Sequence, residues 1–100
     1  MEHTITRLVR VSAQEGGLSC EATLGKMRGK KFTRVRLAVM LVATELGYSS
    51  SNIGSRLGGR HHTTVLSGVR RAKKLLDGGD AALAALVTAL REEVGNGVQG

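Results

Sequence analysis

Residues 58–66 read Gly-Gly-Arg-His-His-Thr-Thr-Val-Leu, which sets a dense group of hydrogen-bonding side chains directly in front of an apolar pair. Imidazole can donate to or accept from the edge of a base. Threonine offers a hydroxyl together with a methyl group that can meet the methyl of thymine. Adjacent residues of a helix point in different directions, and no second ligand cluster accompanies His61 and His62, so the pattern disfavours a metal site. Thr63 and Thr64 could also serve only as helix caps.

The charge of the chain indicates a polyanionic partner. Fifteen Lys and Arg against eight Asp and Glu give a formal net charge of +7. Twelve of these fifteen cations fall in two blocks without any acid, residues 26–36 and 56–74, whereas seven of the eight acids lie in residues 1–25 and 75–100. A merely solvated surface would mix the two signs, so the segregation favours binding to nucleic acid.

The same composition narrows the kind of partner. Phe32 and Tyr48 are the only aromatic residues, whereas proteins that hold single strands usually stack bases on aromatic rings. Duplex DNA is therefore the expected partner. No apolar run is long enough for a membrane span and no signal peptide opens the sequence, so we expect a cytoplasmic protein associated with the nucleoid.

No arrangement of residues indicates catalysis. Cys20 is the only cysteine, so the sequence predicts neither a disulfide framework nor a multi-cysteine metal site. Residues 17–27 have some likeness to a phosphate loop, but Met27 stands where a serine or threonine should hold magnesium. We therefore expect no enzyme activity, no nucleotide, no metal and no other cofactor.

Helices must position these residues, because apolar residues recur at helical spacing and proline is absent. The predicted helices cover residues 3–14, 19–25, 33–46, about 50–57 and 62–76, with a last helix after the capping residue Asp80. The helix over 33–46 is apolar nearly all round and should be the buried centre of the core. Serines 49–51 offer N-caps for the short helix that follows it.

A short helix, the turn at Gly58 and Gly59 and a longer helix are the parts of a helix-turn-helix. The longer helix has an apolar stripe and an opposite polar face. The stripe consists of Val65, Val69, Ala72 and Leu76, and the polar face of Thr64, Ser67, Arg71 and Lys74. In this motif the second helix lies in the major groove and its first residues touch base edges.

The sequence LGGRHHTTVLSGVRRAKKL, residues 57–75, resembles the signature of domain IV, the C-terminal DNA-binding domain of the bacterial replication initiator DnaA. That family commonly has GGRDHTTVLHA followed by a basic helix. The likeness extends from about Ile5 to Val94 and includes GKMRGKKFTRVR, LAVMLVATEL and SNIGSRLGG. It implies an all-α, Trp-repressor-like domain of five to six helices over residues 1–94. The residues GNGVQG at the end of the chain are expected to form a frayed tail over 95–100.

The resemblance also implies roles for individual residues. His62, Thr63 and Thr64 match the base and phosphate contacts of the family, and Arg28 matches an arginine that enters the minor groove. Arg36 matches an arginine that contacts phosphate. The complete expected set has base contacts from His61, His62, Thr63, Thr64 and Ser67, and phosphate contacts from Lys30, Lys31, Arg34, Arg36, Ser50, Arg60 and Arg71.

Three residues depart from the family pattern. His61 replaces an acidic residue, Ser67 replaces a histidine, and Gly68 replaces an alanine. The first two lie on the reading face, so the preferred DNA site is not expected to be the usual initiator box. We expect histidine to cap the helix less well than aspartate, and Gly68 to weaken the helix by up to ~1 kcal/mol relative to alanine.

These observations predict a free-standing protein that binds specific duplex sequences and controls replication initiation, as a competitor or helper, or transcription. The alternative is an interaction module that keeps the fold, binds a replication or regulatory protein with its last helix, and has only weak, non-specific affinity for DNA.

Overall fold

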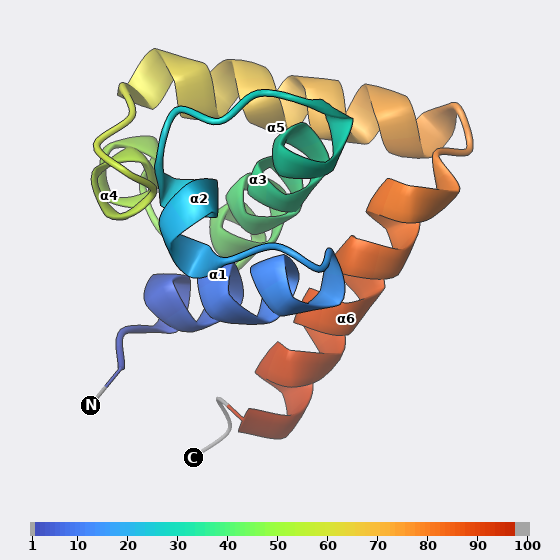
Figure 1. Cartoon of the computed structure of the whole chain (residues 1–100), viewed down its shortest axis with the longest axis horizontal. Helices are drawn as coiled ribbons and strands as arrows, with labels where there is room; N and C mark the ends of the chain where they lie inside the picture. Colours follow the sequence, from blue (N-terminus) through green and yellow to red (C-terminus); the bar gives the residue numbers. More distant parts are fainter. Residues whose placement is uncertain (1, 98–100) are drawn as a thin grey trace.

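The computed structural model describes residues 2–97, with side chains to residue 95, and this part of the chain contains helices and no strand. The six helices are α1 (Thr4–Glu15), α2 (Cys20–Leu24), α3 (Lys30–Glu45), α4 (Ser50–Arg56), α5 (His62–Asp77) and α6 (Ala81–Gly97) (Figure 1). The all-α fold and each predicted helix are confirmed. In the described range no helix has the length and apolarity that crossing a membrane requires.

Two boundaries differ from the prediction by three residues, and the other differences are of one residue. Helix α3 begins at Lys30, three residues before the predicted start, because the polar residues ahead of the apolar run are helical as well. Helix α6 continues to Gly97, whereas the predicted domain ended at residue 94 and the predicted tail covered 95–100. Residues 98–100 lie outside the described part of the chain.

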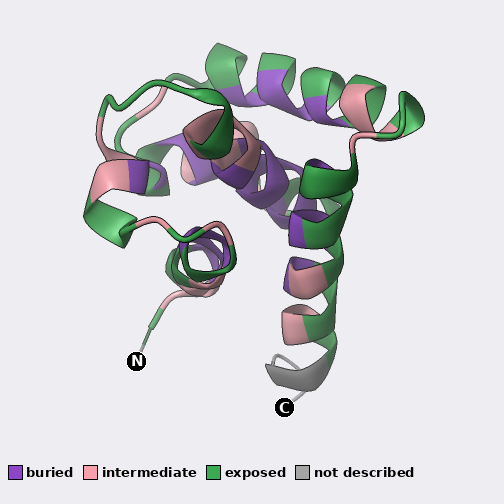
Figure 2. Cartoon of the chain, turned by 45° about the vertical axis from the view of Figure 1, so that its right-hand side comes forward, coloured by how far each residue is buried: buried purple, intermediate pink, exposed green. Residues whose placement is uncertain are grey.

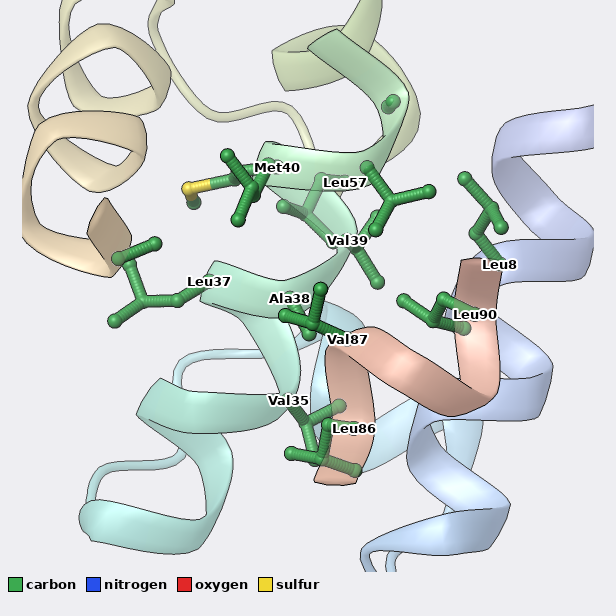
Figure 3. Close-up of a cluster of buried hydrophobic side chains, with 14 of the residues drawn as sticks. Leu8, Val35, Leu37, Ala38, Val39, Met40, Leu57, Leu86, Val87 and Leu90 are labelled. Carbon is green, nitrogen blue, oxygen red and sulfur yellow. The ribbon is translucent and has the colours of Figure 1, made fainter. Parts of the chain in front are cut away.

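Helix α3 is the centre of the core, as its sequence predicts. Every residue from Leu37 to Ala43 is buried, and so is Val35. Helices α1, α5 and α6 pack around it, with α5 and α1 on opposite sides (Figure 1). In Figure 3, Leu8 and Leu90 meet one side of α3, and Leu37 and Met40 point the other way, toward α5.

Helix α5 has the predicted division into two faces. Val65, Val69 and Ala72 are buried in the core, and Leu76, the last residue of the predicted stripe, is partly buried against it. The residues of the predicted polar face, Thr64, Ser67, Arg71 and Lys74, are all exposed. Figure 2 shows the buried stripe on the inner side of this helix and exposed residues on its outer side. The polar face is therefore available to a partner.

The connection from α4 to α5 is a tight turn. Ser49 caps α4 by accepting a hydrogen bond from the Asn52 N–H at 3.1 Å. Gly58 and Gly59 have φ of +73° and +74°, a region that glycine adopts readily. A Cβ on Gly54 would collide with the carbonyl oxygen of Arg60, so the chain leading into α5 passes close against α4 here. Glycines thus fix the helix-turn-helix geometry.

Candidate nucleic-acid interface

The first turn of α5 carries the histidines and threonines that opened the sequence analysis. His61, His62, Thr63 and Thr64 are all exposed. His61 is the N-cap of α5, and the two imidazole rings lie 4.2 Å apart between centroids. Four polar side chains are therefore presented together by the end of one rigid helix. We call residues 61–64 the reading turn.

A hollow of about 390 Å³ lies between the reading turn and α3. Thr63, Thr64, Ser67 and Arg71 line it from α5. Thr33, Arg36, Leu37 and Met40 line it from α3, with Gly68 and Arg60 completing its wall. Sequence reasoning did not select Thr33, although its position three residues before Arg36 places it on the same side of α3. The hollow gathers hydroxyl and guanidinium groups next to the reading turn.

Gly68 has a packing role that the sequence did not reveal. It is buried, and a Cβ at this position would run into the sulfur of Met40 and approach Leu37 Cδ2 at 3.3 Å. The absent side chain lets α5 lie close to α3. Glycine was expected only to lower the stability of the helix, but here it also permits close packing against α3.

The segment between α2 and α3, residues 25–29, passes alongside the start of α5 (Figure 1). We call it the basic loop, because it carries Lys26 and Arg28, both exposed. Gly29 at its end has φ of +130° and turns the chain into α3. The arginine expected in the minor groove thus projects from a loop beside the reading turn.

Helix α3 separates its basic residues onto two sides. Arg36 lines the hollow beside α5, whereas Lys30, three residues before Thr33 and four before Arg34, is assigned to neither side by its position alone. Lys31 and Arg34 instead line a second hollow of about 290 Å³, formed with residues of α6 such as Leu86. The structure therefore does not bring Lys31 and Arg34 to the hollow beside the reading turn.

Arg34 is engaged by an acid. Its Nη2 lies 2.6 Å from Asp80 Oδ2 and its Nε lies 3.0 Å from Asp80 Oδ1. Asp80 also accepts a hydrogen bond from the Leu83 N–H at 2.9 Å, which confirms its predicted role as the cap of α6. The hydrogen bonds from Arg34 and then from Leu83 lower the pKa of Asp80 to about 2. Arg34 therefore fastens α3 to the start of α6.

Arg36 and Arg60 donate to backbone carbonyls rather than standing open to solvent. Arg36 binds the carbonyls of Thr23, Gly25 and Met27. Arg60 binds those of Leu24, Gly25 and Leu57. Partial burial lowers the pKa of both guanidiniums, and the charge of Arg60 adds to this effect at Arg36. Both residues reach the hollow, but most of their hydrogen bonding is internal.

The remaining expected phosphate contacts lie on α4 and α5. Ser50 is the first residue of α4 and is half-buried, and Arg71 is exposed in the wall of the hollow. The four ion pairs described in residues 2–97 all lie elsewhere: Arg10–Glu2, Arg7–Glu93, Arg34–Asp80 and Arg91–Glu45. None of these ion pairs uses a cation of α4, α5 or the basic loop. The described residues contain no group of three or more metal-binding side chains.

Comparisons with known proteins identify a helix-turn-helix family that this chain matches. The family model described as bacterial dnaA protein helix-turn-helix matches residues 5–72. The chain is 39% identical over 90 residues to the chromosomal replication initiator protein DnaA of Thermomicrobium roseum, covering 89% of this chain and 18% of that protein. It is 38% identical over 73 residues to DnaA of Caulobacter vibrioides, covering 72% of this chain and 15% of that protein. The chain thus spans less than one fifth of the length of these relatives.

Proposed function

Because this chain belongs to the bacterial DnaA helix-turn-helix family, we propose that it binds specific sequences of double-stranded DNA and controls replication initiation at an origin, or transcription. The observation that carries the proposal is the exposed reading turn, which adjoins a hollow lined by hydroxyls and guanidiniums. Such a helix end can enter the major groove and meet base edges and phosphates together.

In this arrangement the reading turn and Ser67 contact bases. Imidazole and hydroxyl groups can satisfy both donors and acceptors on base edges. Helix α4 crosses the DNA backbone, as the first helix of such a motif does, and Ser50 at its start donates to phosphate. The direction of the polar face of α5 supports this assignment.

The basic loop occupies the adjacent minor groove and Arg28 enters it. A narrow A·T-rich minor groove has a strongly negative potential that attracts an inserted arginine. Lys30 and Arg71 contact phosphates on either side. Arg36 and Arg60 can contact phosphate only through those N–H groups that make no hydrogen bond within the protein. Lys31 and Arg34 lie on the side of α6, so they would contact phosphate only if the bound duplex extended past the basic loop in that direction.

Selection of bound sequences from a random duplex pool tests the proposal. One recurring motif is expected. Affinity for that motif should fall on the order of a hundredfold or more between ~50 and ~200 mM salt, because phosphate contacts release counterions. A flat salt profile, or recovery of unrelated sequences together with tight binding to a protein, would favour the interaction module instead.

A further inference from the structure

Arg60 joins the helix-turn-helix to the basic loop. It immediately precedes His61, the N-cap of α5, but its side chain turns back toward α2. Its Nη1 lies 2.6 Å from the Leu57 carbonyl oxygen and 3.3 Å from that of Leu24, and its Nη2 lies 2.7 Å from that of Gly25. One planar guanidinium therefore connects the end of α4 with the first residue of the basic loop.

Arg36 holds the same loop from the side of α3. Its Nη2 lies 3.1 Å from the Gly25 carbonyl oxygen and its Nη1 lies 2.7 Å from that of Met27. The Gly25 carbonyl thus accepts from both guanidiniums. Arg28 follows Met27 directly, so the loop is anchored on the N-terminal side of the residue expected in the minor groove.

The backbone at this junction is packed as closely as glycine permits. A Cβ on Gly58 would collide with the carbonyl oxygen of Leu24 and would lie 2.7 Å from Nη1 of Arg60. The turn of the helix-turn-helix therefore touches the end of α2 directly. None of the ion pairs that the structure describes pairs either arginine with a carboxylate. Backbone carbonyls hold both guanidiniums here, and that of Arg36 also lies 5.5 Å from the ring centroid of Phe32.

We propose that Arg60 is a positioning residue, which fixes the basic loop relative to the reading turn so that the minor-groove and major-groove contacts are made at one spacing along the duplex. The proposal rests on the proposed function. A loop held in its bound position loses less freedom when the complex forms. Arg60 and Arg28 should therefore act as a coupled pair although their roles differ.

Arg60→Lys tests this role, because lysine keeps the charge but cannot span three carbonyls with a planar fork. Arg71→Lys is the matched control, since it makes the same chemical change at an exposed residue of the same helix-turn-helix. Thermal melts establish that both variants are folded. Amide hydrogen exchange of residues 26–29 in the DNA-free protein should accelerate in Arg60→Lys and stay unchanged in Arg71→Lys.

The decisive measurement is a double-mutant cycle on the selected duplex. Replacing Arg28 by alanine should weaken binding about tenfold or more in the wild-type and Arg71→Lys backgrounds, but less than about twofold in Arg60→Lys. An equal loss in all three backgrounds, with unchanged exchange of the loop, would overturn the positioning role. A wild-type protein that prefers no duplex would instead overturn the proposed function, which the random-pool selection reports separately.

Should Arg60→Lys fail to fold, the wild-type protein offers a second measurement. One base pair is inserted between the A·T-rich end and the rest of the selected site. If the loop is fixed, it cannot follow the A·T-rich end to its new position. The lengthened duplex should then bind about as weakly as one whose A·T-rich end has been replaced. Retained affinity for the lengthened site would show that the loop adjusts to its target, contrary to the proposal.

Discussion

The imidazole of His61 accepts a hydrogen bond from the backbone N–H of Thr63, with 3.2 Å between the nitrogens, and the same Nδ1 lies 2.8 Å from the Thr63 hydroxyl oxygen. A backbone amide can only donate, so Nδ1 is the unprotonated nitrogen and the neutral ring carries its hydrogen on Nε2. His61 thus caps α5, and the nitrogen left for a partner is a donor. Aspartate at this position would cap the helix and could only accept.

His61→Asp should therefore change the base that is read. A donor at this position suits the acceptors of guanine, whereas a carboxylate selects the amino group of cytosine or adenine. We expect the selected sequence to shift at one or two adjacent base pairs toward the common initiator box, and non-specific binding to fall because the carboxylate repels phosphate. Parallel selections with both proteins measure this. Identical sequence logos would mean that His61 does not read a base.

Arg28→Ala and Lys30→Ala should separate base preference from general affinity. Arg28→Ala should weaken the specific site about tenfold and relax the preference at its A·T-rich end. Lys30→Ala should weaken all sequences alike and reduce the slope of log affinity against log salt by about one. Titrations of specific and random duplexes at several salt concentrations measure both effects. Equal losses on both duplexes for Arg28→Ala would make it a backbone contact only.

Val69→Asp should unfold the domain, because the carboxylate would be buried without a partner in the contact between α5 and the core. Val69 is 8% exposed, and a penalty of several kcal/mol, roughly 3 or more, is a large part of the stability of a small domain. Leu66→Asp is the matched control on the same helix, since Leu66 is 47% exposed. Circular-dichroism melts should show a cooperative transition for the control alone. A near-wild-type melt for Val69→Asp would contradict the observed faces of α5.

Asp80→Asn should lower the melting temperature at neutral pH. Asparagine can still cap α6, but it loses the charge that pairs with Arg34. The folded pKa of Asp80, about 2, lies below its ordinary value of 3.8, so its ionised form stabilises the fold above pH ~4. That contribution is lost as the pH falls from ~4 toward ~2. Melts of both proteins across this range should converge, and a difference independent of pH would show that the ion pair adds nothing.

The helices and their buried faces could be predicted because each depends on local patterns. The stripe of Val65, Val69 and Ala72 has the spacing of one helix face, and Asp80 follows a pair of glycines as a cap does. The early start of α3 was not predicted, because Lys30 and Lys31 add nothing to the apolar pattern from which the helix was predicted. The sequence pattern alone does not show that these lysines are helical, because they carry no apolar side chain that would mark a buried face.

The division of the arginines could not be read from the chain. Arg34, Arg36 and Arg60 all belong to acid-free blocks, yet one pairs with a distant aspartate and two bind carbonyls at the end of α2. These partners are 46, 13 and 35 positions away, so only the packing of helices brings them within reach. The packing role of Gly68 could not be predicted for the same reason, because it depends on contact with Met40 on another helix.

The position of the four ion pairs also governs how the domain meets its target. Each pair involves an arginine of α1, α3 or α6, whereas no cation of α4, α5 or the basic loop takes part in any of the four. The charge distribution is therefore that of a dipole whose positive end is formed by the cations of α4, α5 and the basic loop. In the field of a polyanion such a dipole experiences a torque that rotates this end forward before collision, and steering of this kind can raise association rates by about 10- to 1000-fold at low salt. Glu45→Lys adds positive charge at the end of α3, outside α4, α5 and the basic loop, and so weakens the dipole. Its association rate constant with DNA should therefore rise by less than the added charge alone would give.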